Sequence, residues 1–355
     1  PFFPLGWYFG PGPTAPEYRT HLDRVAASPF NTIMCYGINA GDLQRVRTYL
    51  DELHRRKLKI LYSIKDVYEG TRYYQESVLG FRGEDAIVKG VVGAFRTHPA
   101  VLGWYLNDEL PLSMRDRLEA RYEQVRRLDP DHPTWAVLYQ VGDLRGYLGT
   151  ADVLGTDPYP VGRAPITMVA DWTRRSSEAS GGFRPLWQVP QAHDWACYDA
   201  RNADKLRAPT LDEEMVMSYL CLIHGAHGLV FYSYQDLLRD RLGFDRRWAD
   251  MLVVGNEIKQ LFPALLSTAP APRLTVQRAG GDLHLTLRAD AAGNYYVLMA
   301  NPDPDRGATA HVTVPAGMSA ELLRHAVRRH MPRPADGRVQ VALPPMGAAT
   351  LILKR

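Results

Sequence analysis

Apolar residues in the first two-thirds of the chain form short continuous runs that alternate with helical patterns. Eight runs have the length of strands, at residues 5–9, 32–36, 59–64, 101–106, 134–138, 153–156, 185–189 and 228–232. Strands of a parallel sheet that are buried on both faces have this composition. Between the runs, apolar residues recur every three or four positions, as in the stripe formed by Leu43, Val46, Leu50 and Leu53. This spacing predicts amphipathic helices, and the alternation of strand and helix predicts a parallel sheet.

Eight strands with intervening helices fit a closed (β/α)8 barrel, the α/β fold known as the TIM barrel. An open doubly wound sheet is the alternative, and it often carries a glycine-rich phosphate loop after its first strand. Here the segment Gly10-Pro11-Gly12-Pro13 puts prolines where backbone N–H donors would be needed. We therefore predict a barrel over residues 1–268, a length that this fold commonly has.

The pattern changes after the last predicted helix, where Pro270-Ala271-Pro272 interrupts the chain. From Arg273 onward, six short β-rich runs follow, at residues 274–277, 283–287, 295–300, 310–314, 339–343 and 349–353. Turn residues such as Gly280-Gly281 separate most of them. We predict a small antiparallel β-sandwich domain over residues 273–355.

Composition and charge exclude several classes of partner. The 355 residues include 46% hydrophobic and 23% charged residues, and the formal net charge is +3. Lysines and arginines are scattered and form no stripe for nucleic acid. No apolar run approaches the roughly 20 residues that cross a bilayer. The cysteines, Cys35, Cys197 and Cys221, are odd in number and far apart, so we expect neither a disulfide framework nor a metal site, and no cofactor.

Active sites of such barrels lie at the C-terminal ends of the strands. The candidate residues at or just after these ends are Trp7, Tyr36, Asp66, Asn107, Asp108, Glu109, Tyr139, Asp157, Tyr159, Gln191, Asp194, Trp195 and Tyr232. Aromatic rings stack on the apolar faces of sugars, amides and carboxylates bind hydroxyl groups, and paired carboxylates carry out glycosidic chemistry. This set predicts a carbohydrate-processing site, and its shortage of lysine and arginine disfavours substrates rich in phosphate.

The strongest segment is the fourth strand, which runs directly into Asn107, Asp108 and Glu109. Carboxylates that lie close together push one pKa upward, and a raised pKa suits a general acid. On a regular strand Asp108 and Glu109 would point to opposite faces, so both reach the barrel mouth only if the strand ends or bulges there. The alternative is a pair of carboxylates that only caps the loop after the strand.

This segment resembles a clan of (β/α)8-barrel glycoside hydrolases whose fourth strand ends in Asn-Glu. The sequence Trp104-Tyr105-Leu106-Asn107-Asp108-Glu109 is similar but has an additional Asp, and Asp157-Pro158-Tyr159-Pro160 and the trailing β-domain are also similar. The resemblance implies a glycosidase with Glu109 as general acid/base and Asp108 as its partner. The clan's nucleophile, a Glu at the end of the seventh strand, is not matched, since Gln188 and Gln191 stand there.

The residues at the strand ends are compatible with three mechanisms. In an inverting reaction Glu109 is the acid and a second carboxylate activates water, the candidates being Asp66, Asp157, Asp194 and Asp236. In a substrate-assisted reaction, as in the hexosaminidases with adjacent Asp-Glu, Asp108 orients the substrate's acetamido group. In the third, the barrel binds sugar without cleaving it. A sugar lyase or isomerase with Lys65, Asp66 or a tyrosine as base is a further alternative.

The expected partner is an oligo- or polysaccharide, with no nucleic acid and no membrane, and the sequence leaves the oligomeric state open. The chain begins at Pro1 rather than Met, so a signal peptide could have been removed. Because many glycans lie outside the cell, we expect a secreted or periplasmic protein, with the cytoplasm as the alternative. His224 and His227 precede the eighth strand, at the end opposite to catalysis, and we expect both to be structural.

Overall fold

The computed structural model describes residues 1–332 and 337–355. Its first part is an eight-stranded parallel sheet in the order β8-β7-β6-β3-β2-β1-β10-β9. The strands are β1 (Leu5–Tyr8), β2 (Thr32–Met34), β3 (Lys59–Ser63), β6 (Val101–Asp108), β7 (Thr134–Leu138), β8 (Val153–Thr156), β9 (Trp187–Gln188) and β10 (Gly228–Phe231). Between β8 and β9, Leu154 N donates to Pro185 O at 3.2 Å and Val189 N donates to Thr156 O at 2.9 Å. These bonds close the sheet, so the predicted barrel and its eight strands are confirmed.

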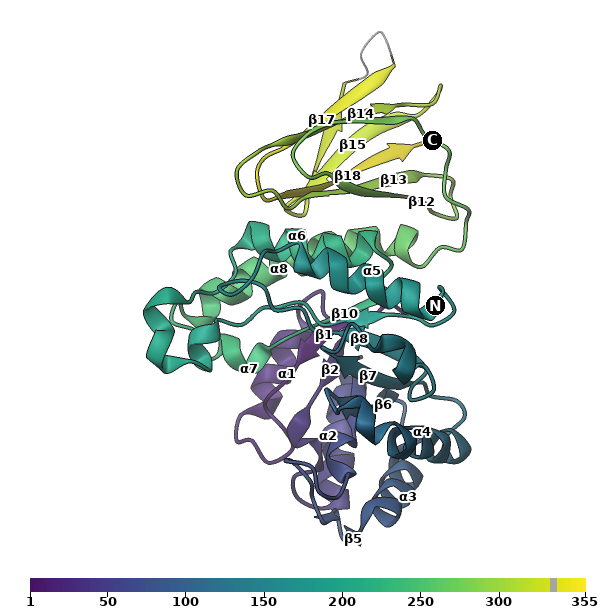
Figure 1. Cartoon of the computed structure of the whole chain (residues 1–355), viewed down its shortest axis with the longest axis vertical. Helices are drawn as coiled ribbons and strands as arrows, with labels where there is room; N and C mark the ends of the chain where they lie inside the picture. The colour runs from purple at the N-terminus through teal and green to yellow at the C-terminus, as the bar shows by residue number, and fades with distance from the viewer. Residues whose placement is uncertain (333–336) are drawn as a thin grey trace.

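Helices surround the barrel (Figure 1). They are α1 (Tyr18–Ala26), α2 (Leu43–Arg55), α3 (Glu84–Phe95), α4 (Arg115–Leu128), α5 (Met168–Ser180), α6 (Leu211–Ile223), α7 (Tyr234–Leu237) and α8 (Phe244–Leu265). A short hairpin of β4 (Ser77–Val78) and β5 (Phe81–Arg82) precedes α3. The stripe Val46, Leu50 and Leu53 is fully buried, as an amphipathic helix packed on the barrel requires.

The barrel interior is filled mainly by large aromatic side chains. Tyr105 and Trp135 lie with ring centroids 4.8 Å apart, and Tyr8 lies 5.9 Å from Trp135. All three rings are buried, together with aliphatic residues from β2, β3 and β10. The interior is therefore a packed core rather than a pore.

The C-terminal part is a sandwich of two antiparallel sheets. One sheet contains β11 (Val276–Gly280), β14 (Ala308–Thr313) and β17 (Arg338–Leu343). The other contains, in spatial order, β12 (His284–Ala289), β13 (Tyr295–Asn301), β18 (Gly347–Lys354), β15 (Ser319–Arg324) and β16 (Val327–Met331). An apolar core that includes Val297, Val312 and Leu351 joins the two sheets, so the predicted sandwich is confirmed.

The hairpin β15–β16 was not predicted, for two physical reasons. Its turn is made by His325 and Ala326, which adopt φ angles of 50° and 62° without a glycine to mark the position. In addition, β16 is an edge strand whose exposed residues include Arg328 and Arg329, so it has no alternating apolar pattern.

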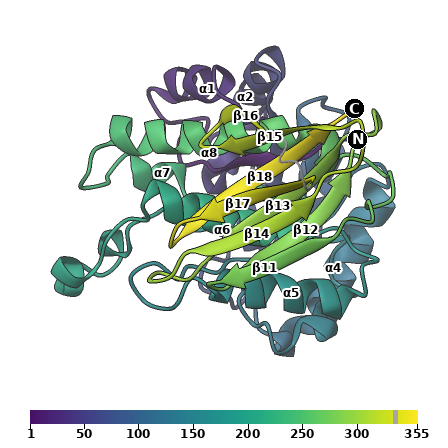
Figure 2. The ribbon, with the colours of Figure 1, turned by 90° about the horizontal axis from the view of Figure 1, so that it is seen from above.

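The five-stranded sheet packs on α6 and α8, on the side of the barrel wall and away from its mouth (Figures 1 and 2). Leu298 and Ile352 of this sheet belong to the same apolar cluster as the barrel helices. At the centre of the interface Tyr219 Oη donates to Glu257 Oε1 at 2.5 Å and contacts Thr350 Oγ1 at 2.9 Å. The β-domain therefore supports two helices of the barrel.

The same interface contains a pair of histidines, His224 and His284, whose ring nitrogens lie 2.8 Å apart. Burial, and then the neighbouring His284 and Arg174, lower the pKa of His224 to about 4. Because His224 titrates near pH 6.5 in the unfolded chain, its stabilising contribution is complete above that pH and is lost as the pH falls toward 4. We expect urea denaturation to show a smaller loss of stability between pH 7 and 5 in His224→Gln than in the wild type. Equal losses in the two proteins would contradict this expectation.

Candidate active site

A cavity of about 490 Å³ opens at the C-terminal ends of the barrel strands. It is lined by Tyr8, Tyr36, Lys65, Asp66, Tyr73, Asp108, Glu109, Asp157, Tyr159, His193, Trp195, Tyr198 and Tyr232. Most of these residues end a strand or follow it closely, so six different strand ends contribute to one site. The volume is in the range of pockets that hold small molecules.

Two backbone irregularities turn both Asp108 and Glu109 toward this cavity. The pairing of β6 with β7 shifts its register between Tyr105 and Asn107, as in a β-bulge. Glu109 then adopts a φ of 60°, which is uncommon for a residue other than glycine. Gln140 Nε2 donates to Glu109 O at 2.9 Å and holds this turn. Strained backbone of this kind concentrates at functional sites, and here it provides the bulge that two inward-facing carboxylates need.

Asp108 is held by three donors. Tyr105 Oη donates to its Oδ1 at 2.5 Å and Tyr36 Oη donates to its Oδ2 at 3.1 Å. Lys65 Nζ lies 3.3 Å from Oδ2 and also bonds Asp66 Oδ1 at 2.8 Å. Charge-assisted bonds of this kind are strong and fix the orientation of the acceptor. Asp108 therefore presents a carboxylate of fixed position to the cavity.

Asp157 behaves differently because it follows β8 in a buried position. Burial raises its pKa well above the ordinary value, and the adjacent Glu109, through a shared hydrogen bond and its charge, and then Asp108 raise it further. Its Oδ1 has no hydrogen-bond partner among the described residues. Burial and the neighbouring carboxyl groups of Glu109 and Asp108 therefore favour the protonated form of Asp157.

This environment predicts that Asp157 lowers the stability of the fold at neutral pH. Since its pKa is raised in the folded protein, its contribution is favourable only below the unfolded pKa of about 3.9 and is lost as the pH rises. We expect Asp157→Asn to raise the free energy of unfolding by about 1 kcal/mol or more at pH 7, and by less at pH 5. Urea denaturation at both pH values measures this, and a destabilised variant at pH 7 would refute it.

Aromatic side chains form the walls of the cavity. The ring centroids of Tyr159 and Tyr232 lie 5.4 Å apart, and Tyr8 lies 5.1 Å from Tyr232. His193 meets the rings of Tyr159 and Trp195 edge-on, at 4.9 and 4.7 Å. Burial lowers the pKa of His193 to about 4, so its ring is neutral at neutral pH. The walls combine flat apolar faces with hydroxyl groups, a surface that suits a ring bearing hydroxyls.

Eight of the residues predicted from sequence line this cavity: Tyr36, Asp66, Asp108, Glu109, Asp157, Tyr159, Trp195 and Tyr232. Five further lining residues were outside the predicted set of catalytic and substrate-binding residues, although Lys65 had been considered as the base of a lyase or isomerase: Tyr8, Lys65, Tyr73, His193 and Tyr198. Tyr8 could have been found from side-chain alternation, because a strand that directs Trp7 outward directs its neighbour inward. Tyr73 and Tyr198 lie on long loops, where no periodic pattern marks them.

Three predicted residues lie outside the cavity for reasons of local geometry. Trp7 points to the helices and packs on Phe30 and Trp248, with centroids 5.0 and 5.8 Å away. Asn107 is buried, and its Oδ1 accepts a bond from Leu110 N at 2.9 Å, which stabilises the turn after β6. Tyr139 is 53% exposed and does not line the cavity.

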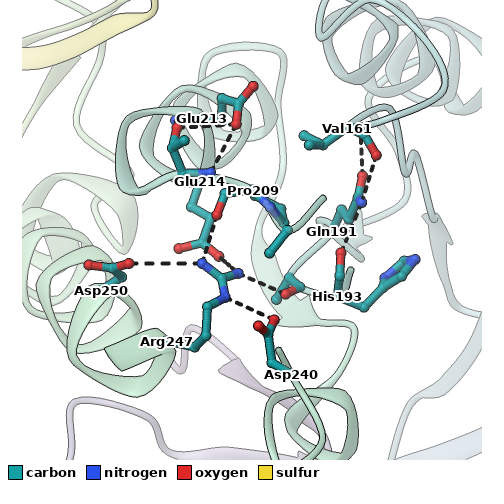
Figure 3. Close-up of polar contacts among 12 residues, drawn as sticks. Val161, Gln191, His193, Pro209, Glu213, Glu214, Asp240, Arg247 and Asp250 are labelled. Carbon is teal, nitrogen blue, oxygen red and sulfur yellow. Dashed lines mark hydrogen bonds and ion pairs between the residues drawn. The ribbon is translucent and has the colours of Figure 1, made fainter. Parts of the chain in front are cut away.

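Gln191 and Asp194, also predicted as ligands, hold the loop after β9 instead. Gln191 is buried, accepts from Val161 N at 2.7 Å and donates to Val161 O at 3.1 Å (Figure 3). Asp194 bonds Arg241 Nη2 at 2.7 Å and accepts from Ala196 N at 2.8 Å. Both contacts fix the segment that carries His193 and Trp195, so their role is to support the cavity wall.

Arg247 of α8, which is 1% exposed, donates hydrogen bonds to the same loop. Its Nη2 donates to Ala192 O at 2.9 Å and to Glu214 Oε1 at 2.6 Å, and its Nη1 donates to Pro209 O at 2.7 Å (Figure 3). Asp240 lies 3.3 Å from its Nε. A second cavity of about 580 Å³ lies beside this cluster, and its charged groups are largely paired with one another.

Within residues 1–332 and 337–355, no group of three or more His, Cys, Asp or Glu side chains has the arrangement of a metal site. Over the same residues, no helix combines the length and the apolar composition needed to cross a membrane.

The sequence matches no model of a protein family and no curated protein. Solved structures do share its fold. A family 5 glycoside hydrolase from Bacteroides vulgatus has a TM-score of 0.64 at 14% identity, covering 98% of this chain and 89% of its own. A β-L-arabinopyranosidase from Geobacillus stearothermophilus in complex with arabinose has 0.63 at 13%, covering 99% and 97%. An α-amylase from Geobacillus thermoleovorans in complex with acarbose has 0.62 at 12%, covering 100% of both chains. This chain therefore has the barrel fold that these glycoside hydrolases share.

Proposed function

We propose that this protein is a glycoside hydrolase in which Glu109 is the general acid/base and Asp108 its anionic partner. The observation that carries the proposal is that two adjacent carboxylates, turned to the same side by a bulge, face an aromatic cavity at the barrel mouth. Glycosidic cleavage needs a proton donor and a negative group near a cationic transition state, and this cavity offers both. The fold shared with several glycoside hydrolases agrees with the proposal.

Each carboxyl group has its own role in this proposal. Glu109 protonates the glycosidic oxygen, and Asp157, whose raised pKa favours its protonated form, lies beside it as a source from which that proton is replaced. Asp108, fixed by Tyr36, Tyr105 and Lys65, stabilises the oxocarbenium-like transition state or orients an acetamido group. The hydroxyl groups of Tyr198 and Tyr232, 3.1 Å apart at the cavity wall, bind sugar hydroxyls.

The seventh barrel strand, β9, and the segment after it have glutamines at the positions where the standard double displacement needs a carboxylate nucleophile. Gln188 is buried and its Oε1 accepts from Thr156 N at 2.6 Å, while Gln191 is bonded to Val161. Neither amide lines the cavity. Of the four carboxylates considered as water activators, Asp66 and Asp157 line the cavity, whereas Asp194 and Asp236 are paired with arginines. Because the raised pKa of Asp157 favours its protonated form, Asp66 is the remaining candidate for the base. Two mechanisms are therefore proposed, inversion with Asp66 as the base and substrate assistance.

Aryl glycosides that differ only in a 2-hydroxyl or a 2-acetamido group separate these mechanisms. Substrate assistance predicts phenol release from the acetamido sugars alone, and proton NMR detects retention in the first product. Inversion predicts release from both sugars and the opposite anomer. If Asp66→Asn retains full activity on 2-hydroxyl substrates, inversion with Asp66 as the base is excluded.

A carbohydrate-binding barrel without catalysis is the second candidate, and the absence of a carboxylate on the seventh strand favours it. This candidate predicts that oligosaccharides bind to the wild type and to Glu109→Gln with similar affinity and that neither protein releases a reducing end.

A further inference from the structure

The charges around the cavity are unbalanced. Its lining contains four acidic side chains and a single cation, and no arginine lines it in the described part of the chain. Even with a proton on both Glu109 and Asp157, the two carboxylates of Asp66 and Asp108 outnumber the one ammonium group, that of Lys65. His193 adds no positive charge at neutral pH. The cavity is therefore electronegative before any ligand enters.

Lys65, the one lining cation among the described residues, is already paired with acidic side chains. Lys65 Nζ bonds Asp66 Oδ1 at 2.8 Å, lies 3.3 Å from Asp108 Oδ2, and stands 4.7 and 5.0 Å from the ring centroids of Tyr36 and Tyr73. Its side chain is 7% exposed. A carboxylate on a substrate would have to displace one of these partners to reach it, and would leave that partner as an unpaired charge.

Arginines contact several of the aromatic lining residues without lining the cavity themselves, and one of them, Arg72, lies 5.2 Å from the ring centroid of Tyr73. Arg163 lies over the ring of Trp195, 3.6 Å from its centroid, and 3.7 Å from the carboxylate of Asp199. Arg239 pairs with Asp236 and lies 5.1 Å from the ring centroid of Tyr198. Neither guanidinium lines the cavity. The inner surface offers ring faces and carboxyl oxygens, and these attract hydroxyl donors or cations rather than anions.

We propose that the cavity selects a glycone without negative charge, neutral or amino sugars, and rejects uronic acids and sulfated or phosphorylated sugars. Lys65 acts as an internal counter-ion for Asp66 and Asp108 rather than as a ligand for an anionic substrate. The inference deepens the proposed function and rests on it, because it concerns the sugar that the same cavity holds.

Matched pairs of aryl glycosides test the charge selectivity, namely gluco- and galactosides against the corresponding uronides with the same leaving group and anomeric configuration. We expect kcat/KM to be at least a hundredfold lower for each uronide that is compared with a hydrolysed neutral sugar. We expect Asp66→Asn, which removes one negative charge, to reduce the ratio between the kcat/KM of the neutral sugar and that of its uronide. A uronide that is cleaved as fast as its neutral partner would overturn the proposal.

Two further measurements keep the inference separate from the proposed function. Calorimetric titration with glucose, glucosamine and glucuronate measures charge preference without hydrolysis, and we expect glucuronate to bind at least tenfold more weakly than the other two sugars. If glucuronate binds more weakly than the other two sugars and no glycoside is hydrolysed, the charge selectivity is supported and the proposed hydrolase function is not. In Lys65→Met, which removes the one lining cation among the described residues, we expect the preference for glucose over glucuronate to grow, because the cavity becomes more negative. Glucuronate that binds to the wild type as tightly as glucose would overturn the proposal.

Discussion

Replacing Glu109 with Gln is expected to lower kcat/KM for aryl glycosides by about 10²- to 10⁴-fold, the contribution usual for a positioned general acid. The amide keeps the size of the side chain and removes its proton. The loss should grow as the leaving group becomes more basic, because a poor leaving group depends most on protonation. Initial rates for a series of substituted phenols, from nitrophenyl to unsubstituted phenyl, measure this trend.

The structure provides controls for that experiment. Glu109 is exposed, so its replacement should change the free energy of unfolding by no more than about 0.5 kcal/mol. Glu123, on α4, is an exposed residue away from the cavity, and Glu123→Gln should retain full activity. A uniform loss across all leaving groups would contradict the role of Glu109 as acid, although it would still permit a role in binding.

Replacing Arg247 with Met is expected to have the largest effect on stability, a loss of about 3–5 kcal/mol. The guanidinium is fully buried, and its removal leaves Glu214 and Asp240 without their cation in the interior. It also removes the donors to Pro209 O and Ala192 O, which precede α6 and the cavity loop. Urea denaturation monitored by tryptophan fluorescence measures the loss.

The neighbouring Arg246 is a matched control, because it is exposed and Arg246→Met should change stability by no more than about 0.5 kcal/mol. Adding Glu214→Leu to Arg247→Met should recover part of the lost stability, because the unpaired carboxyl group is removed as well. A loss below about 1 kcal/mol in Arg247→Met would show that the cluster does not anchor the loop.

The sequence was informative about the barrel because its strands are buried on both faces. Burial on both faces leaves apolar runs that can be read directly, and all eight were found. It was less informative about side-chain direction. Trp7 and Tyr8 look alike in sequence, yet one packs under the helices and the other enters the cavity, since successive residues alternate along β1.

How well the sequence predicts a residue of the candidate site also depends on whether its position is set locally or by distant segments. Positions immediately after strands, such as Asp66 and Asp157, line the cavity because the barrel brings strand ends together. Gln191 and Asp194 also follow a strand, but their polar groups satisfy loop backbone and Arg241, a requirement set by distant segments. The backbone geometry of Glu109 depends on a bulge against β7, which no local pattern marks.

The most direct test of the central claim is phenol release from a panel of aryl glycosides, including 2-acetamido sugars, by the wild type and by the double variant Asp108→Asn/Glu109→Gln. The double variant carries the same fold and any contaminating activity, so it sets the background. If the protein is a glycoside hydrolase of this kind, the wild type releases phenol from at least one sugar, far above that background. Equal release by the two proteins for every member of the panel would contradict that function.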